Sequence, residues 1–167
     1  AIGITEEADP PLWDQKFYWG YDSDNNLIPK QLNDEAILDE DGNDTGEVQT
    51  GLKTLWKTKQ NEIAASLLND SDKRVIKALD EATTFAEFKA AKPANYTTYR
   101  AAVRTACNTR QSEIDACSDV ATLKELLFGQ VQIQQTNDDG NGVVDADGNA
   151  VMIANPNLAT AWPDEPS

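Results

Sequence analysis

A narrow apolar stripe at helical spacing runs through NYTTYRAAVRTACNTRQSEIDACSD and constrains the fold more than any other feature of the chain. At about 100° per residue, six side chains fall within an arc about 80° wide. They are Tyr96, Tyr99, Val103, Cys107, Ile114 and Cys117. The stripe predicts one amphipathic helix, starting near Asn95–Thr98 and broken at Ser118-Asp119, that packs through this face.

Both cysteines of the chain belong to this stripe, where a thiol behaves as a small buried apolar group. Ten positions of helix separate them, about 15 Å of rise, whereas a disulfide tolerates roughly 7 Å between Cα atoms. We therefore expect two packing residues and not a redox pair.

Arg100 and Arg104 lie on the same predicted helix, four residues apart. Like charges at that spacing repel each other mildly, and neither arginine has an acid three or four positions away. We expect their partners to be carbonyls or acidic side chains elsewhere in the fold, and contact with a second protein is the alternative.

Further helices are predicted on both sides of this one. Apolar residues recur at helical spacing from Gly51 to Leu68, and Asn69-Asp70-Ser71-Asp72 is expected to close that helix and cap the next, KRVIKALDEA. A short helix is expected around Phe85 and Phe88, and a last one in VATLKELLFG. The expected core residues are Leu52, Leu55, Trp56, Leu67, Leu68, Val75, Leu79, Tyr99, Val103, Ile114, Leu123 and Leu127.

The ends of the chain predict β-hairpins. Residues 15–32 read as an aromatic hairpin, residues 37–51 as a second hairpin or an ordered loop, and residues 142–153 as a hairpin turning at Asp147-Gly148. Residues 1–15 are expected to be extended because of Asp9-Pro10-Pro11. The predicted class is α+β, with a helical core at about 50–130 flanked by hairpin arms. The predicted segments are an extended arm with the aromatic hairpin (1–50), the helical module (51–129), and a C-terminal hairpin with an extended tail (130–167).

Two turns, Asp41-Gly42-Asn43 and Asp147-Gly148-Asn149, are the only internal similarity we identify, and we do not treat them as a repeat. The stretch from Asp145 begins like a calcium-binding EF-hand loop, but Ala150 and Pro156 stand where Gly and Glu are required. We expect a hairpin turn and no metal site.

Charge is distributed unevenly along the chain. Residues 1–50 hold 13 acids and 2 bases, residues 51–130 hold 10 acids and 12 bases, and residues 131–167 hold 6 acids and no base. Acidic arms are repelled by phosphate backbones, so we expect no nucleic-acid partner. No stretch is long and apolar enough for a membrane span, and the start of the chain lacks a signal-peptide pattern. We expect a non-secreted protein made in the cytosol.

Histidine is absent from the chain, which removes the commonest general base and metal ligand. The glycine-rich phosphate loops, nucleophile elbows and paired-cysteine motifs of common enzymes are missing as well. We therefore expect no catalysis and no cofactor, and only a deep pocket with converging carboxylates would favour an enzyme.

Aromatic side chains are concentrated in the first predicted hairpin. Strand alternation predicts that Phe17, Trp19 and Tyr21 point one way and Tyr18 the other. We expect either that one aromatic face of this hairpin packs on the helices or that the hairpin docks on a partner protein, and both can be true at once. The candidate partner-binding residues are Trp13, Phe17, Trp19, Tyr21, Arg100, Arg104 and Trp162.

The stretch SLLNDSDKRVIKALDEATTFAEFKAAKPANYTTYRAAVRTA resembles the C-terminal helical module of tailed-phage tail proteins. Tail fibre assembly proteins and phage tail assembly chaperones carry this module, and similar ones occur in small virion proteins of marine phages and cyanophages. In the latter it follows a Phe/Tyr-Tyr-Trp hairpin and an Asn-Leu-Ile-Pro-Lys segment, here KFYWG and NLIPK, and the chain ends near a Trp-Pro, here Trp162-Pro163. The likeness covers roughly residues 16–128, and Lys73 stands where the family often has Trp.

The resemblance implies a non-catalytic virion protein, associated with the tail or a tail fibre and assembled in the host cytoplasm. Its expected partners are other virion proteins of the tail, fibre or baseplate, and a homo-oligomer is left open. A tail fibre assembly chaperone that does not stay in the virion is the alternative.

Overall fold

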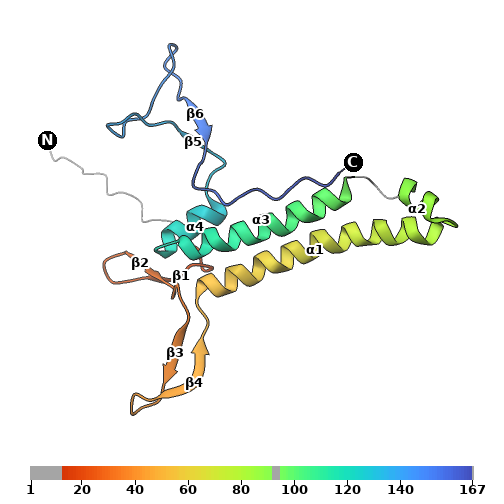
Figure 1. The fold of residues 1–167 in the computed structure, drawn as a ribbon. Helices are drawn as coiled ribbons and strands as arrows, with labels where there is room; N and C mark the ends of the chain where they lie inside the picture. Colours follow the sequence, from red (N-terminus) through yellow and green to blue (C-terminus); the bar gives the residue numbers. More distant parts are fainter. Residues whose placement is uncertain (1–12, 92–94, 167) are drawn as a thin grey trace. The chain divides into compact units, whose positions relative to one another are not determined.

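The computed structural model describes residues 13–91 and 95–166. Within these ranges the chain forms four helices and three two-stranded antiparallel sheets, which confirms the predicted α+β class (Figure 1). It divides into two compact units, residues 1–54 and 55–167, which are described separately. Most of the predicted extended segment 1–15 lies outside the described residues.

Two hairpins make up the described sheets of the first unit. Strand β1 (Tyr18–Tyr21) pairs with β2 (Leu27–Pro29), which confirms the aromatic hairpin. Strand β3 (Glu35–Leu38) pairs with β4 (Asp44–Gln49), so the segment that the sequence left open between hairpin and loop is a hairpin.

The loop between β2 and β3 caps the helix that follows β4. The Asp34 carboxylate accepts hydrogen bonds from the Gly51 N–H at 2.7 Å and the Thr54 hydroxyl at 2.9 Å, and the Gln31 carbonyl accepts from Leu52 N–H at 2.9 Å. These bonds satisfy donors that the first turn of a helix otherwise leaves unpaired. A Cβ at Gly51 would lie 2.3 Å from the Asn33 carbonyl carbon, so the close approach requires glycine.

Four helices follow along the chain: α1 (Leu52–Glu81), α2 (Phe85–Ala91), α3 (Tyr96–Ala116) and α4 (Val120–Phe128). The three later helices confirm the predicted ones. The Asp119 carboxylate caps α4 by accepting from Thr122 N–H at 2.7 Å, and the Gly129 N–H donates to the Glu125 carbonyl at 2.8 Å to close it.

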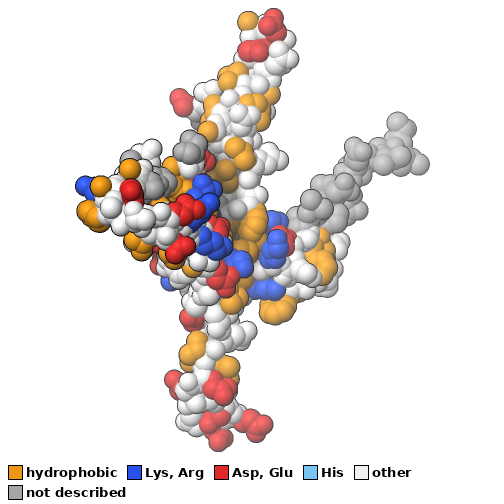
Figure 2. Space-filling model, turned by 90° about the vertical axis from the view of Figure 1, so that its right-hand side faces the viewer, with side chains coloured by type: hydrophobic (Ala, Val, Ile, Leu, Met, Phe, Trp, Pro, Cys, Tyr) orange, Lys and Arg blue, Asp and Glu red, His pale blue; other side chains and the backbone are white. Residues whose placement is uncertain are grey.

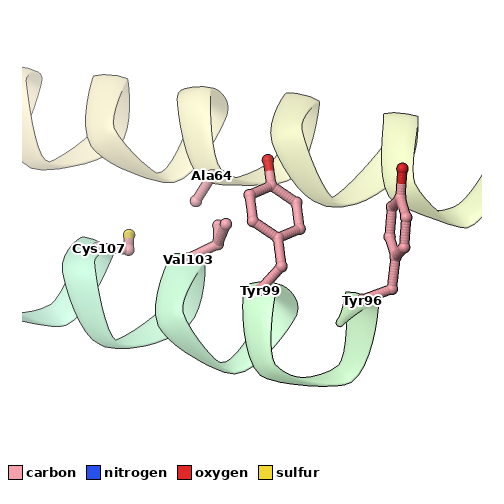
Figure 3. Close-up of a cluster of buried hydrophobic side chains, with 5 residues drawn as sticks. All are labelled: Ala64, Tyr96, Tyr99, Val103 and Cys107. Carbon is pink, nitrogen blue, oxygen red and sulfur yellow. The ribbon is translucent and has the colours of Figure 1, made fainter. Parts of the chain in front are cut away.

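The apolar stripe of α3 is fully confirmed, because all six of its predicted members are buried. Four of them, Tyr96, Tyr99, Val103 and Cys107, form a cluster with Ala64 of α1 (Figure 3). Figure 3 shows Ala64 directed at the α3 side chains while the two tyrosines reach up beside α1. The tyrosine rings meet edge to face with 6.1 Å between centroids.

Small side chains form much of the buried face of α1, together with Leu52 and Gln60, and Leu67 and Leu68 pack partly buried against the cluster. Ala64, Ser71 and Ala78 recur every seven residues and are all buried, and Ala64 lies in the cluster with the bulky α3 side chains. Leu55 and Leu79, which were expected in the core, are exposed. Leu55 lies nine positions before Ala64, about half a turn away around the helix, so its distance from the buried face follows from helix geometry.

The predicted break at Asn69-Asp70-Ser71-Asp72 is wrong, since α1 continues through it for 30 residues. The Ser71 hydroxyl donates to the Leu68 carbonyl at 2.7 Å and accepts from the Arg100 guanidinium at 2.7 Å. Arg100 also forms an ion pair with the Asp72 carboxylate. The two side chains that would cap a new helix are therefore occupied by an arginine of α3, and nothing interrupts the backbone ladder.

Polar side chains line the edges of the α1–α3 interface. Lys57 pairs with Asp115 at 2.8 Å, the Arg110 Nε–H donates to the Gln60 side-chain oxygen Oε1 at 2.7 Å, and the Asn61 side-chain oxygen accepts from Gln111 at 2.8 Å. Residue numbers rise along α1 as they fall along α3. The two helices are thus antiparallel in one fixed register.

Residues 130–154 form a more elaborate arm than the single predicted hairpin. Strand β5 (Gln132–Gln134) pairs with β6 (Met152–Ala154), and two tight turns lie between them. Gln135 N–H donates to the Val151 carbonyl at 2.8 Å, Val151 N–H to Val143 at 3.0 Å, and Val143 N–H to Gln135 at 2.7 Å. These three bonds form a closed ring through Gln135, Val143 and Val151, which follow one another at intervals of eight residues. The segments that begin at the first two, QTNDDGNG and VVDADGNA, are two copies of an eight-residue repeat.

Replacing Arg100 with alanine is expected to lower the free energy of unfolding by about 2 kcal/mol, because hydrogen bonds to a charged, half-buried group are lost. Arg104→Ala is the matched control: Arg104 is exposed and bonds only the Arg100 carbonyl at 3.4 Å, so its loss should cost less than about 0.5 kcal/mol. Urea unfolding followed by tryptophan fluorescence measures both. Equal effects of the two substitutions would contradict the role given to Arg100.

Candidate protein-docking surfaces

The aromatic residues of the first hairpin are not presented on one face as predicted. Phe17 is 0% exposed whereas Trp19 is 65% exposed, and Tyr21 is also exposed. Phe17 precedes β1, and a register shift between Tyr18 and Gly20 interrupts the alternation that the sequence pattern assumed. Phe17 is therefore a packing residue, while Trp19 and Tyr21 remain available as surface anchors.

The exposed indoles of this hairpin are held in defined positions. The Trp13 Nε1–H donates to the Tyr18 carbonyl at 3.2 Å, and the Lys30 ammonium lies 4.7 Å from the centroid of the Trp19 ring. The same ammonium donates to the Gln15 carbonyl. Because two tryptophans are fixed before any partner binds, docking through them costs less side-chain entropy.

The two arginines of the candidate set have different environments. Arg100 is engaged with α1, as the interpretation of bracing within the fold predicted. Arg104 is exposed and forms no ion pair with any of the residues that the structure describes. Both line a shallow pocket of about 280 Å³ together with Asp72, Val75 and Thr97. Arg104 alone of the two is open to a partner carboxylate.

Trp162 is half-buried and packs against the α1–α3 cluster. The Arg110 guanidinium lies 5.3 Å from its ring centroid and donates to the Thr160 carbonyl. The Glu113 carboxylate accepts from the Thr160 N–H at 2.9 Å and from its hydroxyl at 2.5 Å. Trp162 thus anchors the C-terminal segment to the helices of its own chain, and its contacts are intramolecular.

The last described residues continue this attachment. Glu165 pairs with Arg74 at 3.3 Å and accepts a hydrogen bond from the Tyr96 hydroxyl at 3.1 Å. Burial, together with the bond to Glu165, raises the pKa of Tyr96. Figure 1 shows the C-terminal segment running along α3. We name residues 155–165 the strap.

An open cleft of about 790 Å³ lies where the strap meets α3 and α4. Apolar side chains provide much of its lining, and Glu113 and Glu125 are its two carboxylates. Both carboxylates hold the strap: Glu113 through Thr160, and Glu125 through the Asn155 side-chain amide at 2.6 Å. The cleft offers an apolar groove, and its acidic groups have a structural role.

One turn geometry recurs four times, although the sequence reading found only two related turns and no repeat. In each copy a side-chain oxygen of the first residue accepts from the N–H groups two and four positions later, at 2.8–3.1 Å. The copies are Asp22–Asn26, Asp39–Asn43, Asn137–Asn141 and Asp145–Asn149. The fourth residue has positive φ in every copy and is Gly in three of them and Asn25 in the first.

The pattern [Asp/Asn]-x-Asp-[Gly/Asn]-Asn was readable in the sequence, and a search for it would have found all four turns. Within each turn the side chain of the first residue takes up backbone donors that water would otherwise bind. Hydrogen bonds from the Asn43 N–H and side chain lower the pKa of Asp39, and Asn26 and Asn149 do the same for Asp22 and Asp145.

Comparisons with known proteins give no match to a family model, to a curated protein or to a solved structure. Among the helices in residues 13–91 and 95–166, none has the length and apolar character needed to cross a membrane. Across that same part of the chain, no group of three or more Cys, Asp or Glu side chains is arranged to hold a metal ion.

Acidification is expected to loosen three of the four turns. A carboxyl whose pKa is depressed in the folded protein contributes stability that is complete above its ordinary value of 3.8 and is lost as the pH falls through the lower folded value. The NMR shifts of the Asn43 and Asn149 amides should therefore move with midpoints below 3.8.

The Asn141 amide is the built-in control for this titration, because its acceptor is the Asn137 amide oxygen, which has no proton to gain. Its shift should change much less over the same range. Midpoints at or above the ordinary aspartate value, or an equal movement of Asn141, would show that the carboxylates do not hold these turns.

Proposed function

We propose that this chain is a non-catalytic structural component of a tailed-phage virion, associated with the tail or a tail fibre, and that it acts by docking on neighbouring proteins. Its place is the virion, after assembly in the host cytoplasm. The resemblance of residues 16–128 to the helical module of tail proteins supports this proposal, and so does the absence of histidine from the chain.

The observation that carries the proposal is the exposure of apolar side chains on hairpins of only two strands. An isolated two-stranded hairpin is marginally stable in water, and a soluble monomer seldom leaves apolar surface on several such elements. The exposed members are Trp13, Trp19, Tyr21, Ile28, Ile37, Leu38, Val48, Val131, Val144, Met152 and Ile153. A virion component that inserts its arms between other subunits buries this surface.

The aromatic hairpin is the first anchor of the proposed interface. Trp and Tyr dominate the energetics of protein interfaces because they bury a large area with few rotatable bonds. Trp13 and Trp19 satisfy this description and are held in place by their own hairpin, whereas buried Phe17 does not.

A tail fibre assembly chaperone is the second candidate. The apolar cleft of about 790 Å³ beside the strap favours it, since such a groove suits transient binding of an apolar segment of a client. The two candidates differ in one respect that is simple to measure: a structural component remains in the finished particle, and a chaperone leaves.

Mass spectrometry of gradient-purified particles of the phage that encodes the chain separates them. The structural role predicts peptides of this chain at an abundance comparable to that of other tail proteins. Abundant host cytosolic proteins, which should be depleted, serve as the carry-over control. If the chain is plentiful in the infected-cell lysate and depleted from particles to the same degree as the host proteins, the structural role is wrong and the chaperone is favoured.

A further inference from the structure

The β3–β4 hairpin carries an apolar face that no described residue of its own unit covers. Ala36 and Val48 lie opposite each other in the register and so share a face, and Leu38 follows two positions after Ala36 on the same strand, beyond a register shift. Leu38 is 56% exposed and Val48 58% exposed, and every residue of both strands is exposed. This face, defined by Ala36, Leu38 and Val48, is of the kind that a partner covers.

Charge around this face decides what the partner is. Residues 31–52 contain seven carboxylates and no lysine or arginine. Three of the carboxylates serve the fold: Asp34 caps α1, Asp39 holds the turn, and Asp44 accepts from the Gly46 N–H at 2.8 Å. The other four, Glu35, Glu40, Asp41 and Glu47, are exposed, and their side chains accept no hydrogen bond from any residue that the structure describes. Figure 2 shows acidic side chains at the end of the lower projection and apolar side chains farther from that end.

We infer that the β3–β4 hairpin docks on a basic surface of a different protein, which buries Leu38 and Val48 and pairs its lysines or arginines with the four exposed carboxylates of the hairpin. A protein interface usually combines an apolar core with polar residues at its edge. The inference rests on the proposed function and names the chemistry of the neighbour that this arm meets.

Other occupants fit the charge less well. A second copy of this hairpin would bring seven more carboxylates to the same contact, and like charges facing each other oppose binding. Nucleic acid and anionic membranes carry negative charge, as the hairpin does, and would repel it. Small cations would neutralise the exposed carboxylates but leave Leu38 and Val48 in water. A basic protein surface satisfies both the charge and the apolar face.

Zero-length carbodiimide coupling tests the contact directly, because it joins a carboxylate to a lysine amine only where the two touch. The reaction is run on purified particles and on infected-cell extract, and the cross-linked peptides are identified by mass spectrometry. The expected result is links from Glu35, Glu40, Asp41 or Glu47 to lysines of one other protein. Links only to a second copy of this chain, or none from this segment while other carboxylates of the chain are coupled, would overturn the inference.

Charge-neutral variants make the test quantitative. Replacing the four exposed carboxylates of the hairpin together (E35Q, E40Q, D41N and E47Q) keeps the three structural ones. It should reduce about tenfold the amount of this chain that is recovered bound to its partner, and the binding that remains should depend less on salt concentration. The matched control is E62Q, D70N, D80N and E81Q, which removes the same charge from exposed positions of α1 and should leave recovery unchanged. Equal losses in both variants would show that total charge matters and that the hairpin does not.

The two proposals fail in different ways. A chain that is absent from particles but coupled in extract, through residues 31–52, to a basic protein overturns the virion role and keeps the inference. A chain that is present in particles without such links keeps the virion role and overturns the inference. If the chain is absent from particles and uncoupled in extract, both are wrong.

Discussion

The packing of α3 against the small-residue face of α1 is the interaction on which the second unit depends. Tyr96, Tyr99 and Val103 pack against Ala64. A cavity or an overlarge side chain at this seam would cost stability because protein interiors are packed close to crystal density. Along the interface of the two helices, Arg100 bonds Ser71 near one end, and Arg110 bonds Gln60 and the strap. Lys57 pairs with Asp115 near the other end. The strap, the cleft and α4 all take their positions from this helical pair.

The sequence predicted the buried face of α3 completely and that of α1 only in part, and the difference has a physical cause. The buried face of α3 is made of large apolar residues, so its periodicity is plain. Apart from Leu52, the buried residues of α1 are alanine, serine and glutamine, which a search for large apolar residues passes over, and Leu55 and Leu79 are exposed. The capping pattern at Ser71-Asp72 misled for a similar reason, since its partner Arg100 is distant in sequence. Tertiary contacts override local propensity at such positions.

The arms follow local rules, which makes them easier to derive. Four turns built on one pattern fix four hairpin tips without help from a core, and each uses the side chain of its first residue to hold the loop. Self-contained turns allow the strands beside them to leave apolar and acidic side chains exposed. The candidate anchors divide accordingly: Phe17, Arg100 and Trp162 serve the fold, whereas Trp13, Trp19, Tyr21 and Arg104 remain at the surface. The sequence identified all seven residues as candidates. It could not tell which of them are buried and which are exposed, because burial is a property of the folded chain.

The hairpin arms are proposed to bind neighbouring proteins while the packing of α1 and α3 stays unchanged. Hydrogen–deuterium exchange of the free chain, compared with the chain in its assembled complex, tests this most directly. The account predicts fast exchange of the β3–β4 and β1–β2 amides in the free chain, strong protection of the same amides in the complex, and unchanged protection of α1 and α3. Hairpin amides that exchange at the same rate in both states, with new protection confined to the helices, would contradict it.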